Sequence, residues 1–274
     1  MNVLVLGGGF LGMRVAEAFD AQIITDRITD EYELSEVMAN GVMNWPHVII
    51  NCIGKTGRPN VDSIENEKPE TYISNVHVPY LLAEFCKRNN IKLVHISSGC
   101  VYRGDNGGLG WSESDRPNFD GSFYSFSKSA AERILSAYPE VLTLRMRMPV
   151  SGVPGSRDLI GKLLRYTSIV NTPNSISVVD DFIGALKALV ESKATGVYNV
   201  CNPEPVTHKQ ILDIYEELSG KKLGKTYINA NELVTDAPRS NCVLNVEKVQ
   251  QIYKQRPTIE ALRDVISKYI QNGG

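Results

Sequence analysis

Tyr124 and Lys128 are the residues whose types and spacing most directly suggest chemistry. They stand four positions apart in a segment that reads as helix, so the phenol and the ammonium lie on one face. A neighbouring ammonium favours the phenolate, and we therefore expect Lys128 to lower the pKa of Tyr124. Tyr124 could then exchange a proton with a carbonyl or an alcohol near neutral pH. Most such pairs are solvated helix surface, so this interpretation depends on features elsewhere in the chain.

A glycine-rich turn near the start of the chain is one such feature. Gly7, Gly9 and Gly12 follow a short apolar segment and open a helical pattern, with Phe10 and Leu11 between the last two glycines. Glycines at these positions let the backbone approach a pyrophosphate, and the helix N-terminus offers N–H donors. The alternative is a tight strand–helix turn without a ligand. The position of the turn favours a dinucleotide site.

Asp26 and Arg27 end the next expected strand, about 19 residues after Gly7. A carboxylate at this point binds ribose hydroxyls and favours NAD, whereas an arginine can pair with the 2′-phosphate of NADP. The two residues give competing indications, and either could be ordinary surface charge. The cofactor is therefore predicted as NADP(H) or NAD(H).

The elements that would position these residues alternate between apolar strands and amphipathic helices. Strands are expected at 2–6, 22–25, 47–52, 92–96 and 141–145, and helices at 13–19, 32–40, 69–89 and 124–138. This pattern predicts an α/β fold with a Rossmann-type doubly wound parallel sheet. We assign residues 1–149 to a dinucleotide-binding domain, with returns near 175–200. Residues 150–274 mainly form a smaller C-terminal substrate-binding lobe.

The C-terminal part shows shorter and less regular elements. We expect strands at 175–179 and 196–200, and helices at 158–166, 180–191, 207–219 and 259–270. Asp180 and Thr207 are the expected N-caps of two of these helices. Ligands of doubly wound folds bind beyond the carboxyl ends of the strands. Residues at these ends that we place beside the cofactor are Cys52, Ile53, Gly54 and Met148.

Composition excludes several classes of protein. The net charge of −2 gives no electrostatic footprint for nucleic acid. No apolar run is long enough for a membrane span, and the first residues read as a buried strand rather than a signal peptide. The five cysteines fit neither a disulfide framework nor a zinc pattern, so no metal is expected. We expect a cytoplasmic protein with reduced thiols.

With Ser98, which ends the strand before the Tyr124 helix, the chain resembles the extended short-chain dehydrogenase/reductases. The resemblance implies that Ser98 holds the substrate carbonyl oxygen and that Tyr124 exchanges the proton. Lys128 would bind the nicotinamide ribose and tune the tyrosine. Asn75 matches an asparagine that the family places near the lysine.

Longer motifs resemble one subgroup, the bifunctional nucleotide-rhamnose synthases, which act as 3,5-epimerase and 4-reductase. These motifs occupy residues 56–62, 117–119, 121–125, 144–149, 173–175 and 237–241. The resemblance implies a UDP- or dTDP-4-keto-6-deoxyglucose substrate and a nucleotide-rhamnose product. It assigns substrate contacts to Thr56, Arg58, Asn75, Ser98 and Asn174, and a diphosphate contact to Arg239.

The epimerase activity requires an acid and a base on opposite faces of the sugar ring. The subgroup's epimerisation pair matches Cys100 and Lys162 here, where reductases without this activity typically have tyrosine at the cysteine position. Without the resemblance, a buried inert thiol and a surface lysine would be the simpler interpretations.

Three features depart from the subgroup. The glycine turn is one residue shorter than in most extended members, Asp26 replaces a small residue, and the 103–111 loop is shorter than in the plant enzymes. The first two departures leave the cofactor preference open. Alternatives to the bifunctional activity are a 4-reductase alone, a GDP-sugar epimerase/reductase, or a non-catalytic dinucleotide-binding regulatory subunit. A homodimer through a helical face is common in the family and is an expectation here.

Overall fold

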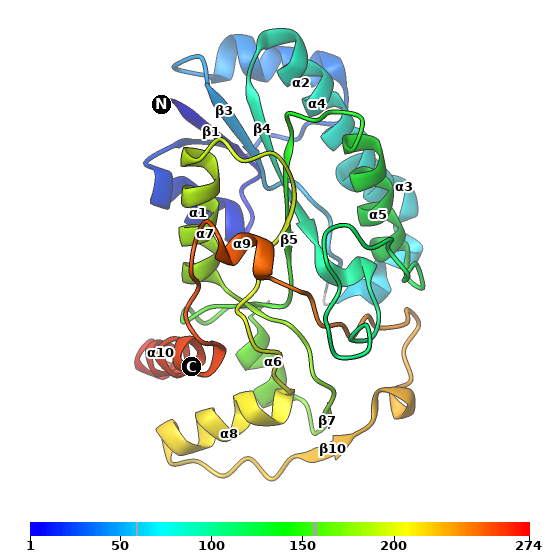
Figure 1. The fold of residues 1–274 in the computed structure, drawn as a ribbon, viewed down its shortest axis with the longest axis vertical. Helices are drawn as coiled ribbons and strands as arrows, with labels where there is room; N and C mark the ends of the chain where they lie inside the picture. The colour runs from blue at the N-terminus through cyan, green and yellow to red at the C-terminus, as the bar shows by residue number, and fades with distance from the viewer. Residues whose placement is uncertain (59, 156–157) are drawn as a thin grey trace.

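Six parallel strands form the central sheet of the computed structural model, which describes residues 1–58, 60–155 and 158–274 (Figure 1). The strands, in spatial order, are β2 (Gln22–Ile24), β1 (Val3–Leu6), β3 (Val48–Asn51), β4 (Lys92–Ser98), β5 (Leu142–Met146) and β9 (Gly196–Asn199). The inner strands are buried on both faces, which explains their nearly continuous apolar sequences. The predicted doubly wound parallel sheet is confirmed. Pro59, within the 56–62 motif, lies outside the described residues.

Helices cover both faces of the sheet. The core on one face includes α1 (Phe10–Phe19) and α7 (Val179–Glu191), whereas the core on the other includes α2 (Glu31–Glu36), α4 (Val78–Asn89) and α5 (Phe123–Leu135) (Figure 1). The chain reverses its direction of winding between β1 and β3, so a crevice is expected at their carboxyl ends. The glycine turn that links β1 to α1 lies at this point.

The predicted helix at 69–89 is divided in the structure. It consists of α3 (Lys68–Tyr72), a π-helical turn at Ile73–His77, and α4. A π turn adds a residue to the helical repeat, so the side chains on either side of it do not follow one regular period. Asn75 lies within this turn and is fully buried.

The two predicted helix caps have different outcomes. Thr207 caps α8 (His208–Ser219) in a capping box with Gln210, as expected. The expectation for Asp180 is wrong, because α7 begins one residue earlier and its N-cap, Val178, provides no side-chain hydrogen bond. Asp180 lies in the first turn instead and forms a 2.8 Å ion pair with Arg14 of α1.

A second hydrophobic core lies in the C-terminal part. It includes residues of α6 (Leu159–Arg165), α8 and α10 (Thr258–Gln271). Two small parallel pairs complete this region, β6 (Pro149–Val150) with β8 (Ser177–Val178) and β7 (Ser168–Val170) with β10 (Thr226–Ile228). The chain returns to the main sheet at α7 and β9. The domain division at residue 149 stays a prediction.

The segment after β10 returns to the loop that follows β4. Gly104 N–H donates to the Asn241 carbonyl at 2.8 Å, and Trp111 N–H donates to the Val243 carbonyl at 2.9 Å. The short helix α9 (Glu247–Gln250) follows and contacts β9. Within the described part of the chain, no helix is both long and apolar enough to cross a membrane.

Candidate active site

The glycine turn has the geometry of a ligand cradle. Gly7 has φ +103°, and a Cβ there would lie 2.8 Å from Ile53 N, while a Cβ on Gly12 would lie 1.9 Å from Gly7 O. A Cβ on Gly9, by contrast, would have no atom within 4 Å. Gly9 is the N-cap of α1, and no side chain caps the helix there, so the N–H groups of the first turn are available to a ligand. These residues fit a pyrophosphate.

The other residues predicted beside the cofactor lie at the start of α1 and in the segments after β2, β3 and β5. Asp26 and Arg27 follow β2 and are exposed, and Phe10 is exposed at the start of α1 while Leu11 packs against the core. Cys52 N–H donates to the Leu6 carbonyl at 2.9 Å, and burial raises the pKa of the Cys52 thiol to about 12. Met148 has φ +40°, which is uncommon for a residue with a side chain.

Ser98, Tyr124 and Lys128 converge at the carboxyl end of β4, and all three side chains are buried. A hydrogen bond joins the Ser98 and Tyr124 side chains, while the Lys128 ammonium donates to the Ile96 carbonyl at 3.1 Å. Tyr124 and Lys128 belong to α5, which Ser122 caps by accepting from Ser125 N. The helix therefore presents both side chains to the end of β4.

The expected effect of Lys128 on Tyr124 is wrong for this structure. Burial raises the pKa of Tyr124, and the cation that opposes the rise is Arg147, together with the Ser98 hydrogen bond. Burial also lowers the pKa of Lys128 to about 8, against the opposing effect of Glu132. The four-residue spacing could not reveal this result, because the depth of the pair depends on the whole sheet.

Asn75 and Gly54 lie beside Lys128. A Cβ on Gly54 would lie 3.5 Å from both Asn75 Oδ1 and Lys128 Nζ. Asn75 accepts from Lys55 N at 2.7 Å and donates to Ser127 Oγ at 3.0 Å, so it joins the loop after β3 to α5. A cavity of about 370 Å³ adjoins this point and is lined by residues that include Gly54, Thr56 and Arg58.

Cys100 lies in the helical turn at Gly99–Val101 and is half-buried. Its N–H donates to Ser98 Oγ at 3.1 Å, so the thiol belongs to the same site as the serine. Arg147, directly after β5, donates from Nη1 to Cys100 Sγ at 3.1 Å. Lys162 is half-buried in α6, an element of the second core region. The structure thus brings Cys100 to Ser98 and Tyr124, and places Lys162 on a different element.

Asn174 has its hydrogen-bonding capacity filled by protein groups. Its Oδ1 accepts from Arg147 Nη2 at 2.8 Å and from Cys242 N at 3.0 Å. Its Nδ2 donates to the Thr172 carbonyl and to Asn241 Oδ1, each at 3.1 Å. A carboxamide offers two donors and two acceptor positions, so direct substrate binding would require one of these bonds to break. The geometry favours a positioning role for Asn174.

Arg239 is paired with Asp62 in a bidentate ion pair, with distances of 2.8 and 2.7 Å. This hydrogen bonding lowers the pKa of the Asp62 carboxyl. Asp62 lies in the helical turn at Val61–Asn66 and Arg239 in the segment after β10, so the pair joins the two regions of the chain. A substrate diphosphate would have to share or displace this carboxylate.

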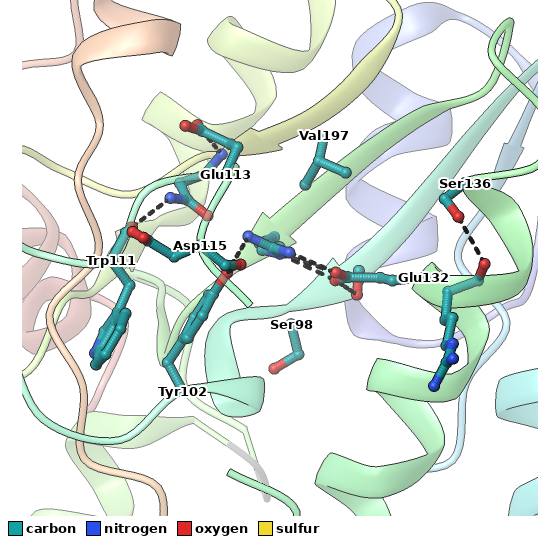
Figure 2. Close-up of polar contacts among 12 residues, drawn as sticks. Ser98, Tyr102, Trp111, Glu113, Asp115, Glu132, Ser136 and Val197 are labelled. Carbon is teal, nitrogen blue, oxygen red and sulfur yellow. Dashed lines mark hydrogen bonds and ion pairs between the residues drawn. The ribbon is translucent and has the colours of Figure 1, made fainter. Parts of the chain in front are cut away.

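A buried charge network lies behind the site. Glu132, one turn after Lys128 in α5, forms a 2.7 Å ion pair with Arg145 of β5, and Arg145 Nη1 donates to Tyr102 Oη at 2.9 Å. Figure 2 shows Tyr102 and Glu132 on either side of this guanidinium. The Tyr102 hydroxyl donates in turn to the Asp115 carbonyl at 2.7 Å. The network ties α5 to the loop after β4.

The sequence placed Arg147 at the carboxyl end of a strand, where ligands bind, but it assigned no role to Arg147 and did not reveal the Arg145–Glu132 pair. A signal was present, because two arginines alternate with apolar residues at the end of a strand expected to be buried. Buried arginines require partners. Among the described residues, no group of three or more His, Cys, Asp or Glu side chains is arranged to hold a metal ion.

Comparisons with known proteins identify the family of the chain. A family model described as the RmlD substrate binding domain matches residues 1–271. A bifunctional dTDP-4-dehydrorhamnose 3,5-epimerase/reductase of Arabidopsis thaliana is 32% identical over an alignment 283 residues long, which covers 98% of this chain and 92% of the relative.

Two solved structures have a similar fold. The UDP-rhamnose synthase of Acanthamoeba polyphaga mimivirus has a TM-score of 0.88 at 28% identity, over 97% of this chain and 99% of that one. A dTDP-4-dehydrorhamnose reductase of Bacillus anthracis, in complex with NADP, has a TM-score of 0.83 at 20% identity, over 99% of both chains. The second likeness concerns the fold alone.

Proposed function

The chain belongs to the RmlD substrate-binding-domain family, and on this premise we propose that it reduces the 4-keto group of a nucleotide-linked 6-deoxy sugar with NADP(H) or NAD(H). We further propose that the same site epimerises the sugar at C3 and C5 before the reduction. The observation that carries both parts is the convergence of Ser98, Cys100 and Tyr124 at the carboxyl end of β4.

The reductase proposal assigns a task to each buried side chain. A bound nicotinamide cofactor supplies the hydride in this class of reaction. The Ser98 hydroxyl holds the C4 oxygen, and Tyr124, which burial keeps protonated, gives its proton to that oxygen. Lys128 lies beside the loop after β3 and binds the cofactor ribose. The glycine turn, with the open space at Gly9, holds the pyrophosphate.

The epimerase proposal depends on the acidity of protons next to a ketone. Cys100 removes a proton from C3 or C5, and Lys162 returns one on the opposite face of the ring. Ser98 and Tyr124 hydrogen-bond the C4 oxygen, so the same groups steady the enolate that forms. The position of Cys100, joined by its N–H to Ser98 Oγ, supports this assignment.

One NMR-monitored reaction tests both activities. The full chain is mixed with UDP- or dTDP-4-keto-6-deoxyglucose and NADPH or NADH in D₂O, with no other enzyme present. We expect a nucleotide-rhamnose with deuterium at C3 and C5. Reduction without deuterium at these carbons would show that the chain is a reductase without epimerase activity. No turnover of either sugar would favour a GDP-sugar enzyme or a regulatory subunit.

Four variants assign the two steps to their residues. Tyr124→Phe should lower reduction by roughly 10²- to 10⁴-fold and leave deuterium exchange measurable. Cys100→Ala should abolish the exchange. The matched controls are Tyr138→Phe, which follows α5, and Cys86→Ala, in the core of α4. Full reduction by Tyr124→Phe, or undiminished exchange by Cys100→Ala, would contradict the respective assignment.

A further inference from the structure

The Arg147 side chain donates a hydrogen bond from Nη1 to Cys100 Sγ at 3.1 Å. A neutral thiol is a weak acceptor, whereas a thiolate accepts strongly from a cation. Arg147 is only 5% exposed, so water screens this interaction little. An arginine held against a sulfur in this way favours the charged form of the cysteine.

The other partners of Arg147 are neutral. Nη2 donates to Asn174 Oδ1 at 2.8 Å and also to the Ser240 carbonyl, and the buried Nε has no hydrogen-bond partner among the described residues. A buried cation without an anion is costly. Across residues 1–58, 60–155 and 158–274, no carboxylate forms an ion pair with Arg147. The groups beside it that can supply a negative charge are three thiols, those of Cys100, Cys242 and Cys201.

Four titratable groups face Cys100 from three elements. They are Tyr124 and Lys128 of α5, Arg147 after β5, and Cys242 of the C-terminal segment. The Cys242 thiol donates to the Gly99 carbonyl at 3.2 Å, which requires its protonated form. Burial keeps Tyr124 neutral and raises the pKa of the Cys201 thiol to about 12. Cys100 is therefore the thiol left to carry the charge that complements Arg147.

We propose that Arg147 is a positioning residue that holds Cys100 as the thiolate and so prepares it as the base of the epimerisation. This inference rests on the proposed function. The thiolate takes a proton from C3 or C5, and the C–H electron pair enters the enolate. Lys162 then gives a proton to the opposite face, which leaves a thiol and a neutral amine. Exchange of protons with water restores the pair.

The test measures the ionisation of Cys100 directly. The full chain is alkylated with iodoacetamide at a series of pH values, and the rate at Cys100 is read from its peptide by mass spectrometry. We expect a wild-type midpoint below the ordinary thiol value of about 8.5. Arg147→Gln should raise the midpoint by about one pH unit or more, a roughly tenfold slower reaction at pH 7. Arg147→Lys should restore part of the shift.

A structural control separates charge from packing. Ser177→Ala removes the hydroxyl that accepts from Arg147 N at 3.0 Å but keeps the guanidinium. It should lower thermal stability and leave the Cys100 midpoint unchanged. A wild-type midpoint at or above 8.5 would overturn the proposal even if the Arg147 variants did not fold. Equal midpoints in wild type and folded Arg147→Gln would overturn it as well.

The same proteins distinguish this proposal from the proposed function. Deuterium exchange at C3 and C5 should fall about tenfold or more in Arg147→Gln at pH 7 and recover as the pH rises. A low wild-type midpoint without any exchange would support the Arg147–Cys100 pairing and overturn the epimerase. Exchange with an unshifted midpoint in Arg147→Gln would overturn the pairing and leave the epimerase in place.

Discussion

Arg145 and Arg147 lie two residues apart at the end of β5, both are buried, and their surroundings differ. Arg145 meets the Glu132 carboxylate through two nitrogens and the Tyr102 hydroxyl through a third. Arg147 meets an amide oxygen, a carbonyl and a thiol, and its Nε has no partner within the described residues. A carboxylate neutralises the positive charge of Arg145, whereas the acidic groups beside Arg147 are thiols, that of Cys100 among them.

This difference indicates a structural role for Arg145 and a chemical role for Arg147. The neutralised guanidinium lies behind the site and joins α5 to the loop after β4. Arg147 and Lys128, which form no ion pair with a carboxylate in the described part of the chain, interact with Cys100 at the site where we propose that the enolate and the thiolate form. Lys128 resembles Arg147 in this respect, because its ammonium donates to the Ile96 carbonyl. Buried cations that are not paired with a carboxylate favour anionic ligands and anionic intermediates.

The largest loss of stability is expected when the ion pair between Glu132 and Arg145 is broken. Glu132→Met leaves the Arg145 guanidinium buried without a carboxylate, which should lower the free energy of unfolding by about 3–5 kcal/mol. The double variant Glu132→Met/Arg145→Met should recover most of this loss. Urea denaturation at pH 7 measures both. A double variant no more stable than the single one would contradict the assignment of the cost to an unpaired charge.

Lys128 gives the second largest effect and a defined pH dependence. Its pKa lies near 8 in the folded protein, below the value of 10.5 for an unperturbed lysine, so the unfolded chain binds more protons between these values. The cost of burying the ammonium is complete below pH 8 and is relieved as the pH rises to 10.5. Lys128→Met should therefore stabilise the ligand-free protein by on the order of 3 kcal/mol at pH 7.

The measurement is chemical denaturation of both proteins from pH 7 to about pH 10.5, the ordinary lysine pKa. The advantage of Lys128→Met should shrink across this range, and a matched surface variant, Lys87→Met at the end of α4, should show no such trend. A stability difference between wild type and Lys128→Met that is constant with pH would be inconsistent with a lowered lysine pKa.

Arg147→Met should cost less stability than Arg145→Met, although both side chains are buried. Arg147→Met leaves neutral acceptors without a donor, which should lower the free energy of unfolding by about 1–3 kcal/mol. It leaves no carboxylate unpaired among the described residues. Arg145→Met leaves the Glu132 carboxylate buried without a cation, so its loss of stability should be about 3–5 kcal/mol. Parallel thermal unfolding of the two variants makes the comparison. If Arg147→Met proved the more damaging, the distinction between the two arginines would fail.

The smallest effect is expected at Arg239, which is paired but partly exposed. Asp62→Asn should lower the free energy of unfolding by less than about 1 kcal/mol at pH 7. Because Arg239 lowers the pKa of Asp62, the wild type has this stabilisation above the ordinary carboxyl pKa and loses it as the pH falls further. The two proteins should therefore converge below about pH 4 in urea titrations. A persistent difference there would indicate a role beyond the ion pair.

Local pattern was sufficient for the sheet and for the glycine turn. The buried strands are nearly continuous apolar runs, and Gly7 and Gly12 stand where any side chain would collide with backbone. The spacing of Tyr124 and Lys128 correctly placed both on one helix. These features depend on neighbours within a few residues, which a sequence displays directly.

The electrostatics of the site could not be predicted in the same way. The pKa of Tyr124 depends on burial by the whole fold, and the partners of Arg147 come from Asn174 and Ser240, which are 27 and 93 residues away. The π turn at Asn75 is also invisible to a search for a regular helical period. Each of these results requires contacts that only the folded chain brings together.

The return of the segment after β10 to the loop after β4 has a consequence for biosynthesis. The last of the six strands ends at Asn199, but the hydrogen bonds from Arg147 to the Ser240 carbonyl and from the Cys242 thiol to the Gly99 carbonyl require residues made later. A ribosome that adds about 5–20 residues per second would therefore complete the sheet some seconds before the catalytic end. A nascent or truncated chain that lacks residues 240–244 would lack these bonds at the thiol site and also Cys242 and Leu244 of the core that packs against the sheet, so the proposed active centre and part of this core are completed last.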